Sequence, residues 1–597
     1  MKYSLSNLLF VFIFLLTLSL LIYPEIKILI FNYNEGYSTL LAQSGKDAIR
    51  EDIFLYYPSY KNLFLGKSFF FDSGNLNFKD NPLPLPYITQ ILGNFLTIIS
   101  AGNDNITIIL LRAVPLISVL LLYKIFINIK FSKTEAIIFS FFTIISVYET
   151  NRFPSPSITY VFFLVSILFI IKSLNFPKNK NYLGSIICGI QIWVYFHNFV
   201  VVAPIFIYSL ILRKFLFNDN TRKILKEFLI FSFLFVSYFI FTLTINGNIE
   251  SSFFEKILWS SDYQEWKDYG IQTTFDGRYK ISIIFISLFT SLLFVFKFKE
   301  IFNYKNLSNF FKNTNFLNYH LFFIIFILTT FFPIILEKFL NFPQPQVIFI
   351  RIGQFQVLLM LCIYYKLIFS FISRKYFRID YEKNINNFFL VIVLFVGIFF
   401  SYKNTSFFNN KINYYNFDFV IKNNEKKLIS FLNNQEKCIF ASTDKKVNNL
   451  VNIQSYCRII NANIFNTNLK FDELIERYVL VDFLAGYDLN NILKRFNLEQ
   501  KFILKENKIC HYNLKKNYKE IVKRDDHISK VFHHGKCDLL ILKKNIIKKY
   551  KLISNKPKIY IEKYKFKYLY HALKDKTYPS NLLKKTKIKN LFVVKLE

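Results

Sequence analysis

An acidic pair, Glu51-Asp52, follows the first long apolar run of the chain and precedes two tyrosines, Tyr56 and Tyr57. A carboxylate close to a membrane face is costly, so its presence there favours a functional role. Such a group can take a proton from a hydroxyl, which contributes roughly 10²- to 10⁴-fold to a rate. We assign the base to Asp52, with Glu51 as its substitute. The alternative is a plain helix start, because acids favour the positive end of a helix dipole without any catalysis.

Three arginines, Arg112, Arg152 and Arg351, suit the binding of phosphate. Each lies at or just inside the end of an apolar run, and the guanidinium fork matches a pair of phosphate oxygens. Arg351 is the strongest candidate, because it lies several residues inside its run, where an unpaired charge is costly. Snorkelling explains Arg152 equally well. His197 is a candidate for binding sugar hydroxyls or phosphate oxygens, although a bare turn is the commoner explanation for such a position.

Aromatic and acidic residues gather in the stretch 246–280. Its tryptophans are Trp259 and Trp266, and its acids include Asp262, Glu265, Asp268 and Asp276. Aromatic faces beside carboxylates suit a pyranose ring, but Trp and Tyr also form belts at membrane interfaces, which is their commoner role. A divalent metal, Mg²⁺ or Mn²⁺, between Asp52 and an acid of this loop is an open alternative, although no spacing motif requires one.

Long apolar runs must position these side chains. Of the 597 residues 53% are hydrophobic, and Phe and Tyr number 75 and 38. Since a span needs about 20 apolar residues, we predict an α-helical polytopic membrane protein with about eleven transmembrane helices. The runs are Leu8–Ile22, Ile106–Ile127, Glu135–Val147, Ser157–Ile171, Tyr182–Phe196, Phe199–Leu212, Phe228–Ile245, Ile281–Phe296, His320–Leu336, Val347–Ile372 and Phe388–Phe400. The first run lacks a small-x-small cleavage site, so we interpret it as an uncleaved span.

Lysines and arginines orient the spans. They collect in the loops around 130–133, 178–180, 213–223, 297–312 and 374–378, which the positive-inside rule places in the cytoplasm together with the N-terminus. The loops 23–85 and 246–280 then lie outside. The net charge of +35 comes without a nucleic-acid-binding motif, so we predict no nucleic-acid partner.

The segment Leu83–Ser100 is apolar enough to cross, but charge argues against it. Crossing would put the link Gly102-Asn103-Asp104-Asn105, which has no Lys or Arg, in the cytoplasm. Prolines at its start and polar residues within it suit a helix lying in the outer interface. We therefore predict a juxtamembrane helix.

After about Tyr402 the chain becomes hydrophilic, and an odd number of spans places residues 402–597 outside as a soluble α/β domain. We expect strands at Glu436–Ala441, Tyr456–Asn461, Tyr478–Phe483 and Cys537–Leu542, with helices near Lys445–Val451 and Asp472–Arg477. The Lys-rich tail 543–595 suits a solvated face better than a contact with anionic headgroups or glycans. Disulfides among Cys438, Cys457, Cys510 and Cys537 are open in connectivity. The pairs Cys510-His511 and His533-His534 match no zinc spacing.

The stretch from Arg50 to Arg112 resembles the GT-C superfamily of membrane glycosyltransferases, especially the protein mannosyltransferase and aminoarabinose-transferase branch. An acidic pair, two tyrosines, a Leu-Gly step, an aspartate, a proline-rich helix start and an arginine at the head of the second span carry the resemblance. In order along the chain these are Glu51-Asp52, Tyr56-Tyr57, Leu65-Gly66, Asp72, Asn81-Pro82-Leu83-Pro84 and Leu111-Arg112. The family pair is usually Asp then Glu and its prolines adjoin, so the chain departs from the pattern at both points.

This resemblance implies a GT-C-like catalytic domain over residues 1–401, with the outer loop 23–105 over the bundle. It implies an inverting glycosyltransferase of the plasma (inner) membrane that takes a sugar from a polyprenyl-phosphate carrier and passes it to a lipid, glycan or protein acceptor outside. Two other classes stay open. A transporter or flippase of lipid-linked glycans would favour internal repeats, of which we find none convincing. A membrane-anchored binding protein would depend on residues 402–597 instead.

Overall fold

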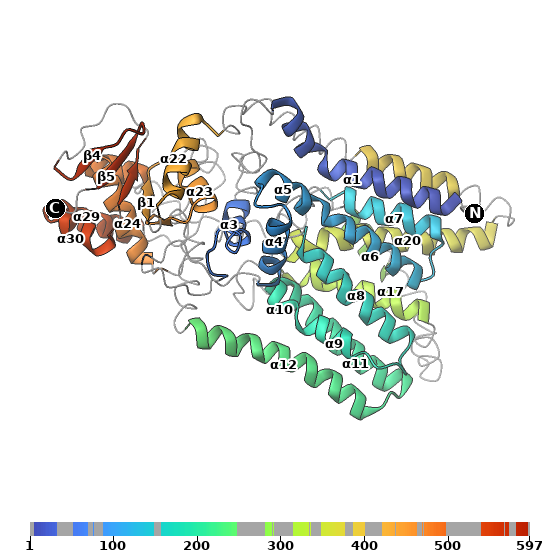
Figure 1. Cartoon of the computed structure of the whole chain (residues 1–597). Coiled ribbons are helices and arrows are strands. Elements are labelled where there is room, and N and C mark those ends of the chain that lie inside the picture. The colour runs from blue at the N-terminus through green and yellow to red at the C-terminus, as the bar shows by residue number, and fades with distance from the viewer. Residues whose placement is uncertain are drawn as a thin grey trace.

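The computed structural model describes most of the chain, with gaps. The described residues are 5–32, 52–69, 76, 87–147, 157–246, 281–288, 290–291, 314–333, 335, 348–376, 386–399, 421–435, 438–461, 469, 471–496, 539–565, 567–571 and 581–594. Figure 1 shows a bundle of helices that holds the N-terminus and a smaller region with a sheet that holds the C-terminus. Helices α3 (Asp52–Tyr60) and α4 (Tyr87–Ile99) lie between these two parts.

Helices overlap every apolar run identified in the sequence. The bundle contains α1 (Leu5–Asn32), α5 (Asp104–Ala113), α6 (Pro115–Asn128), α7 (Lys133–Ile145), α8 (Thr159–Asn175), α9 (Tyr182–Gly189), α10 (Gln191–Val194), α11 (Phe196–Phe217), α12 (Thr221–Asn246), α17 (Thr314–Thr330), the π-helix η4 (Phe349–Gly353) and α20 (Gln354–Tyr376), with further helical residues at 281–288 and 386–399. Ile, Leu and Phe side chains from these helices fill one continuous core. The predicted helical class is therefore confirmed.

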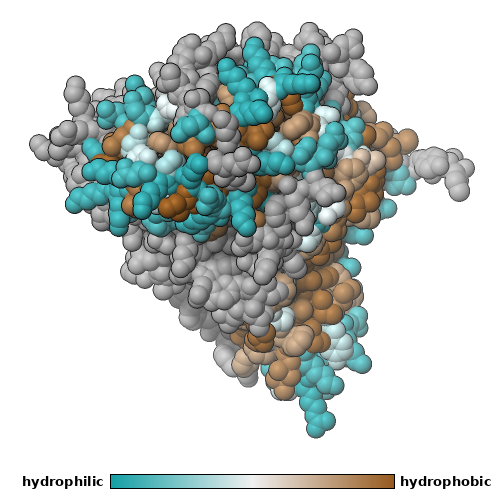
Figure 2. Space-filling model, turned by 60° about the vertical axis from the view of Figure 1, so that its left-hand side comes forward, coloured by the Kyte–Doolittle hydropathy of each residue, from teal (hydrophilic) through white to brown (hydrophobic). Residues whose placement is uncertain are grey.

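Three helical segments in the described part of the chain are long and apolar enough to cross a membrane: Asp104–Asn128, Phe196–Phe217 and Thr221–Phe241. Shorter apolar helices accompany them. Figure 2 shows hydrophobic surface gathered on the bundle and hydrophilic surface over the C-terminal region. Exposed apolar residues such as Phe233 on α12, 71% exposed, are expected where a helix faces lipid. These features indicate membrane integration, and the count of eleven spans stays a prediction.

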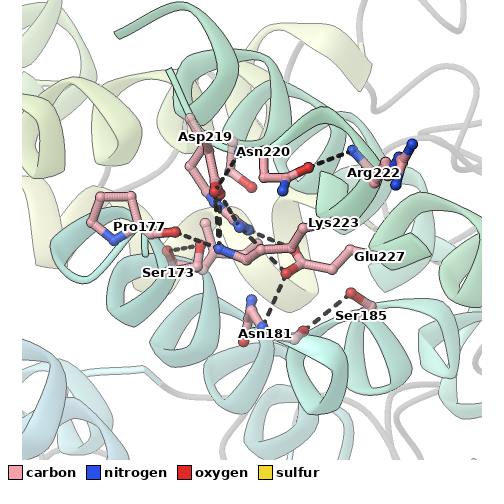
Figure 3. Close-up of polar contacts among 12 residues, drawn as sticks. Ser173, Pro177, Asn181, Ser185, Asp219, Asn220, Arg222, Lys223 and Glu227 are labelled. Atoms are coloured by element: carbon pink, nitrogen blue, oxygen red, sulfur yellow. Dashed lines mark hydrogen bonds and ion pairs between the residues drawn. The ribbon is translucent and has the colours of Figure 1, made fainter. Parts of the chain in front are cut away.

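A buried ion network ties the α8–α9 and α11–α12 turns together (Figure 3). The Arg213 guanidinium donates to Asp219 Oδ2 at 2.6 Å and to Glu227 Oε2 at 2.5 Å. Neither Arg213 nor Glu227 has an exposed side chain. Glu227 also accepts from the Asn181 amide, and Lys223 donates to both Asp219 and the Pro177 carbonyl. Every charge in the network therefore has a partner, which is what burial of charge requires.

A second ion pair, with a buried glutamate and a half-buried lysine, lies at the same end of the bundle. Glu135 closes a capping box with Ser132 at the start of α7 and accepts from Lys366 Nζ of α20 at 2.7 Å. Asn175, at the end of α8, joins this end to α6 and α17 by bonds to Asn128 and Asn318. The basic loops that we predict to be cytoplasmic begin at these helix ends.

The C-terminal region contains one five-stranded mixed sheet in the order β2-β1-β3-β5-β4. Its strands are β1 (Ile439–Ser442), β2 (Arg458–Ile459), β3 (Tyr568–Tyr570), β4 (Leu583–Lys585) and β5 (Leu591–Val594). Strand β1 pairs in parallel with β2 and β3, whereas β5 runs antiparallel to β3 and β4. The helices around it are α22 (Asn423–Asn433), α23 (Lys445–Gln454), α24 (Phe471–Leu484), α25 (Leu489–Arg495), α29 (Leu539–Asn555) and α30 (Pro557–Tyr564).

Two of the four predicted strands are wrong. Tyr478–Phe483 belongs to helix α24, and the described part of Cys537–Leu542 begins helix α29. Both are short apolar runs, which periodicity alone cannot distinguish from a buried helix segment. The acids Asp472 and Glu473 in the first turn of α24 are a helix-start signal that outweighs the run. The tail 543–595 contributes most of α29, all of α30 and the strands β3 to β5.

A disulfide joins Cys438, next to β1, to Cys457, next to β2. This pairing resolves one of the connectivities that the sequence left open, while Cys510 and Cys537 lie outside the described residues. Disulfides persist in oxidising compartments, so the bond agrees with the predicted extracytoplasmic position of this domain.

Reducing this disulfide should destabilise the C-terminal domain. Closing a loop of this size stabilises a fold by about 3 kcal/mol in the chain-entropy model. We expect dithiothreitol to lower the melting temperature of the wild-type domain. The readout is the temperature at which trypsin begins to cleave between residues 421 and 594. The double variant Cys438→Ser/Cys457→Ser should melt at the lowered temperature whether or not reductant is present. An unchanged wild-type melt on reduction would contradict the assignment.

Candidate functional site

Helices α3 and α4 form a bracket above one end of the bundle. After α3 the chain makes a turn that ends at Gly66, whose φ of +68° suits glycine. The two helices approach so closely that the ring of Tyr60 occupies the place where a Cβ on Gly93 would lie. Asn94 of α4 closes the bracket, because its amide donates to the Ser59 carbonyl at 2.8 Å and accepts from the Leu63 amide at 3.1 Å.

The surface of helix α4 is the reverse of that of a soluble amphipathic helix, with polar residues buried and apolar residues exposed. Its buried face is polar and includes Gln90, Asn94 and Thr97, whereas Ile91 and Ile98 on its outer face are 56% and 53% exposed. A polar inner face holds the bracket, and an apolar outer face is expected of a helix in contact with lipid. The predicted helix is therefore present, and the inverted pattern supports its predicted juxtamembrane position.

Asp104, the first residue of α5, is the centre of the polar contacts at this bracket. Its Oδ1 accepts from the Tyr57 hydroxyl at 2.9 Å and from Lys61 Nζ at 2.7 Å. Its Oδ2 accepts from Gln454 Nε2 of α23 at 2.8 Å. Burial and the neighbouring Asp104 carboxylate together raise the pKa of Tyr57 well above its ordinary value. Tyr57 therefore remains a neutral donor at physiological pH.

The acidic pair lies where this bracket begins. Asp52 is the first residue of α3, Tyr56 is half-buried, and Tyr57 is 1% exposed. Both tyrosines pack in one cluster with Leu111 of α5 and Ile453 of α23. Glu51 lies outside the described residues, and only the backbone of Asp52 is described.

Arg112, His197 and Arg351 lie on helix ends that meet at the first turn of α8. Ile158 packs with Leu111, the neighbour of Arg112. The Thr159 carbonyl accepts from the Asn198 amide, next to His197, at 2.8 Å. Tyr160 stacks on Phe355, directly after η4, with ring centroids 3.9 Å apart. The three predicted binding residues therefore occupy the same end of the bundle, opposite the Arg213 network.

Arg112 and Arg351 are both buried, and their role in binding phosphate stays a prediction. Arg112 is 2% exposed and Arg351 is 4% exposed. Arg351 lies in the π-helix η4, and such bulges are frequent at functional sites. His197 is half-buried and lies beside the rings of Tyr195 and Phe196.

The other predicted site residues fall outside the described residues. These are Arg152, Trp259 and Trp266, together with the acids of the loop 246–280. In the described ranges, no group of three or more His, Cys, Asp and Glu side chains is arranged to hold a metal ion.

An apolar groove of about 300 Å³ adjoins the bracket on its outer side. It lies between α4, the α9–α10 junction and α12, and Tyr87, Trp193 and Phe241 form an aromatic wall with ring centroids 5.2 to 5.9 Å apart. Its lining residues are Phe69, Tyr87, Ile88, Ile91, Ile190, Trp193, Leu234, Ser237 and Phe241. Phe69 connects the groove to the bracket, because its carbonyl accepts from Gln90 Nε2 at 2.6 Å.

Sequence reasoning missed Asp104, Lys61 and Gln454. Asp104 lies in the short polar link 102–105, whose lack of Lys and Arg bears on topology but whose residue types alone indicate no site. The available signal was Asn103-Asp104 as a helix start: the Asn103 side chain accepts from the amides of Asn105 and Ile106. No pattern in one sequence pairs residue 104 with residue 454.

Comparisons with known proteins add no information about this site. No protein-family model matches the chain, and no curated protein matches it in sequence.

Proposed function

We propose that this protein is an integral-membrane glycosyltransferase of GT-C type, which transfers a sugar from a polyprenyl-phosphate carrier to an acceptor outside the membrane. In this proposal about eleven helices span the plasma membrane, the N-terminus is cytoplasmic, and residues 402–597 are extracytoplasmic. The observation that carries it is the amphipathic character of α4, whose polar face bonds to α3 and the turn after it while its apolar face lines a groove. An amphiphilic carrier needs such a pair of environments side by side.

In the proposed reaction an acceptor hydroxyl attacks the anomeric carbon of the carrier-bound sugar. The Asp52 carboxylate takes the hydroxyl proton as the new C–O bond forms, and the bond from the anomeric carbon to the phosphate oxygen breaks. The electron pair of that bond leaves with the polyprenyl phosphate, so the anomeric configuration is inverted. Arg112 and Arg351 stabilise the charge that develops on the leaving phosphate. Tyr56 shapes the sugar side of the cleft, and Tyr57, which is buried, holds α3 to Asp104.

Transfer can be tested with purified protein in nanodiscs. Undecaprenyl-phosphate mannose, glucose and aminoarabinose would each be supplied together with octyl mannoside as acceptor, and mass spectrometry would follow both the glycosylated acceptor and free undecaprenyl phosphate. We expect release from at least one donor. A protein that moves these lipids between leaflets of proteoliposomes but never cleaves them would instead be a flippase.

Filling the groove should weaken binding of the lipid carrier. Ile91→Trp places an indole in the groove and should raise the KM for the lipid donor by roughly tenfold, since displacing about two buried methylenes costs about 0.8 kcal/mol each. Ile98→Trp is the matched control, because it adds the same ring to the exposed face of the same helix away from the groove. Equal KM values for the two variants would exclude the groove as the carrier site.

A further inference from the structure

We propose that Asp104 is a positioning residue that docks the C-terminal domain onto the outer loop, so that helix α23 forms one wall of the cleft on its acceptor side. This inference rests on the proposed function. It assigns a role in the reaction to a residue outside the acidic pair, and to a domain that otherwise has none.

Polar contacts carry the first part of the argument. One carboxylate holds three elements far apart in the sequence: Tyr57 on α3, Lys61 in the following turn, and Gln454 at the end of α23. The side chains of Lys61 and Asp104 are only 7% and 11% exposed. A second bond crosses the same interface, since Lys67 Nζ donates to the Asn452 carbonyl at 3.3 Å.

Apolar packing carries the second part. Leu450 and Ile453 of α23 have no exposed surface, and they share a cluster with Tyr57 of α3 and Leu111 of α5. The C-terminal domain therefore presents a buried face to the outer loop. Separating the domain would expose these side chains and leave Asp104 without its Gln454 partner.

The position of Asp104 links this interface to the proposed chemistry. Helix α3, which begins with Asp52, has nine residues and contains Pro58, so it is too short to be stable without tertiary contacts. Asp104 holds it through Tyr57 and also begins α5, the helix that carries Arg112. The same carboxylate therefore fixes the base-bearing helix, the arginine-bearing helix and α23 relative to one another.

Gln454→Glu tests the docking without touching the proposed catalytic residues. It replaces a donor by a second carboxylate at 2.8 Å from Asp104 Oδ2, and like charges this close should shift the docking equilibrium by on the order of 100-fold. We expect hydrogen exchange in full-length protein in nanodiscs to rise at least tenfold in peptides covering 445–454 and 52–60. Peptides covering 354–376 should not change.

Two matched variants separate positioning from a general loss of stability. Gln435→Glu adds the same charge to the same domain at a site where Tyr568 can still donate to the side-chain oxygen, and it should exchange like wild type. The swap Asp104→Asn/Gln454→Glu restores a donor–acceptor pair and keeps a carboxylate near Lys61, so it should recover most of the protection that Gln454→Glu loses.

Transfer kinetics decide the functional part. With octyl mannoside as acceptor and whichever of the three undecaprenyl-phosphate sugars the wild-type protein uses as donor, Gln454→Glu should raise the KM for octyl mannoside at least tenfold and change the KM for the donor less than twofold. Faster exchange with unchanged acceptor KM would overturn the positioning role, and unchanged exchange in 445–454 would overturn the docking. A wild-type protein that transfers no sugar would refute the proposed function alone, because exchange would still report on the docking.

Discussion

Replacing Asp52 with Asn should lower sugar transfer by at least 100-fold, because the amide cannot accept the proton of the attacking hydroxyl, a contribution of about 10²- to 10⁴-fold. The substitution keeps the size of the side chain at the first residue of α3. Losing one charge at a helix start costs only about 0.3–1 kcal/mol, so the protein should still be expressed and folded. Initial rates of carrier release in nanodiscs measure the effect.

Glu51→Gln is the companion to this variant. If Asp52 is the base, Glu51→Gln should keep most of the transfer rate. A large loss in Glu51→Gln with a normal rate in Asp52→Asn would assign the base to Glu51 instead. Full activity in both variants would remove the acidic pair from the mechanism.

Glu227→Ala should unfold the end of the bundle where the Arg213 network joins the α8–α9 and α11–α12 turns. The fully buried Arg213 guanidinium contacts the carboxylates of Asp219 and Glu227, and the variant removes the second of them. Breaking a buried ion pair costs about 3–5 kcal/mol of folding stability. The melting temperature in detergent should therefore fall by many degrees. The measurement is a thermal unfolding curve followed by tryptophan fluorescence.

Two further variants make this result interpretable. Lys214→Gln changes a half-buried lysine in the last turn of α11, whose bond to Thr221 is exposed, and should alter stability by less than about 0.5 kcal/mol. Arg213→Met/Glu227→Leu removes both buried charges and should recover much of the loss, since apolar residues often replace a buried pair at little cost. A wild-type melting curve for Glu227→Ala would show that the network does not hold these turns.

The bundle was predictable because its signal is local. Runs such as Ile106–Ile127 and Phe199–Leu212 are too apolar for anything but a buried or lipid-facing helix, and helices cover both. The α4 helix was predictable from loop charge and prolines. The strand predicted at 478–483 failed because a six-residue, mostly apolar run fits a strand and a buried helix equally well, and the contacts that decide between them come from α29 and other distant segments.

The candidate site was only partly predictable for the same reason. Arg112 and Arg351 stand out in the sequence as charges inside apolar runs, and the structure buries both at one end of the bundle. Asp104 does not stand out, because an acid in a polar link is ordinary. Its importance comes from Tyr57, Lys61 and Gln454, which are 47, 43 and 350 residues away in the chain.

The proposed mechanism requires that α3, which begins with Asp52, and the π-helix η4, which contains Arg351, face one chamber that admits a lipid phosphate. A photoreactive undecaprenyl phosphate with a diazirine near the phosphate tests this directly, by mapping the labelled peptides in nanodisc-embedded protein. We expect labelling within both 52–69 and 348–360. Excess undecaprenyl phosphate should suppress this labelling, and Arg351→Met should reduce it. Labelling confined to the opposite end of the bundle, around 213–227, would contradict it.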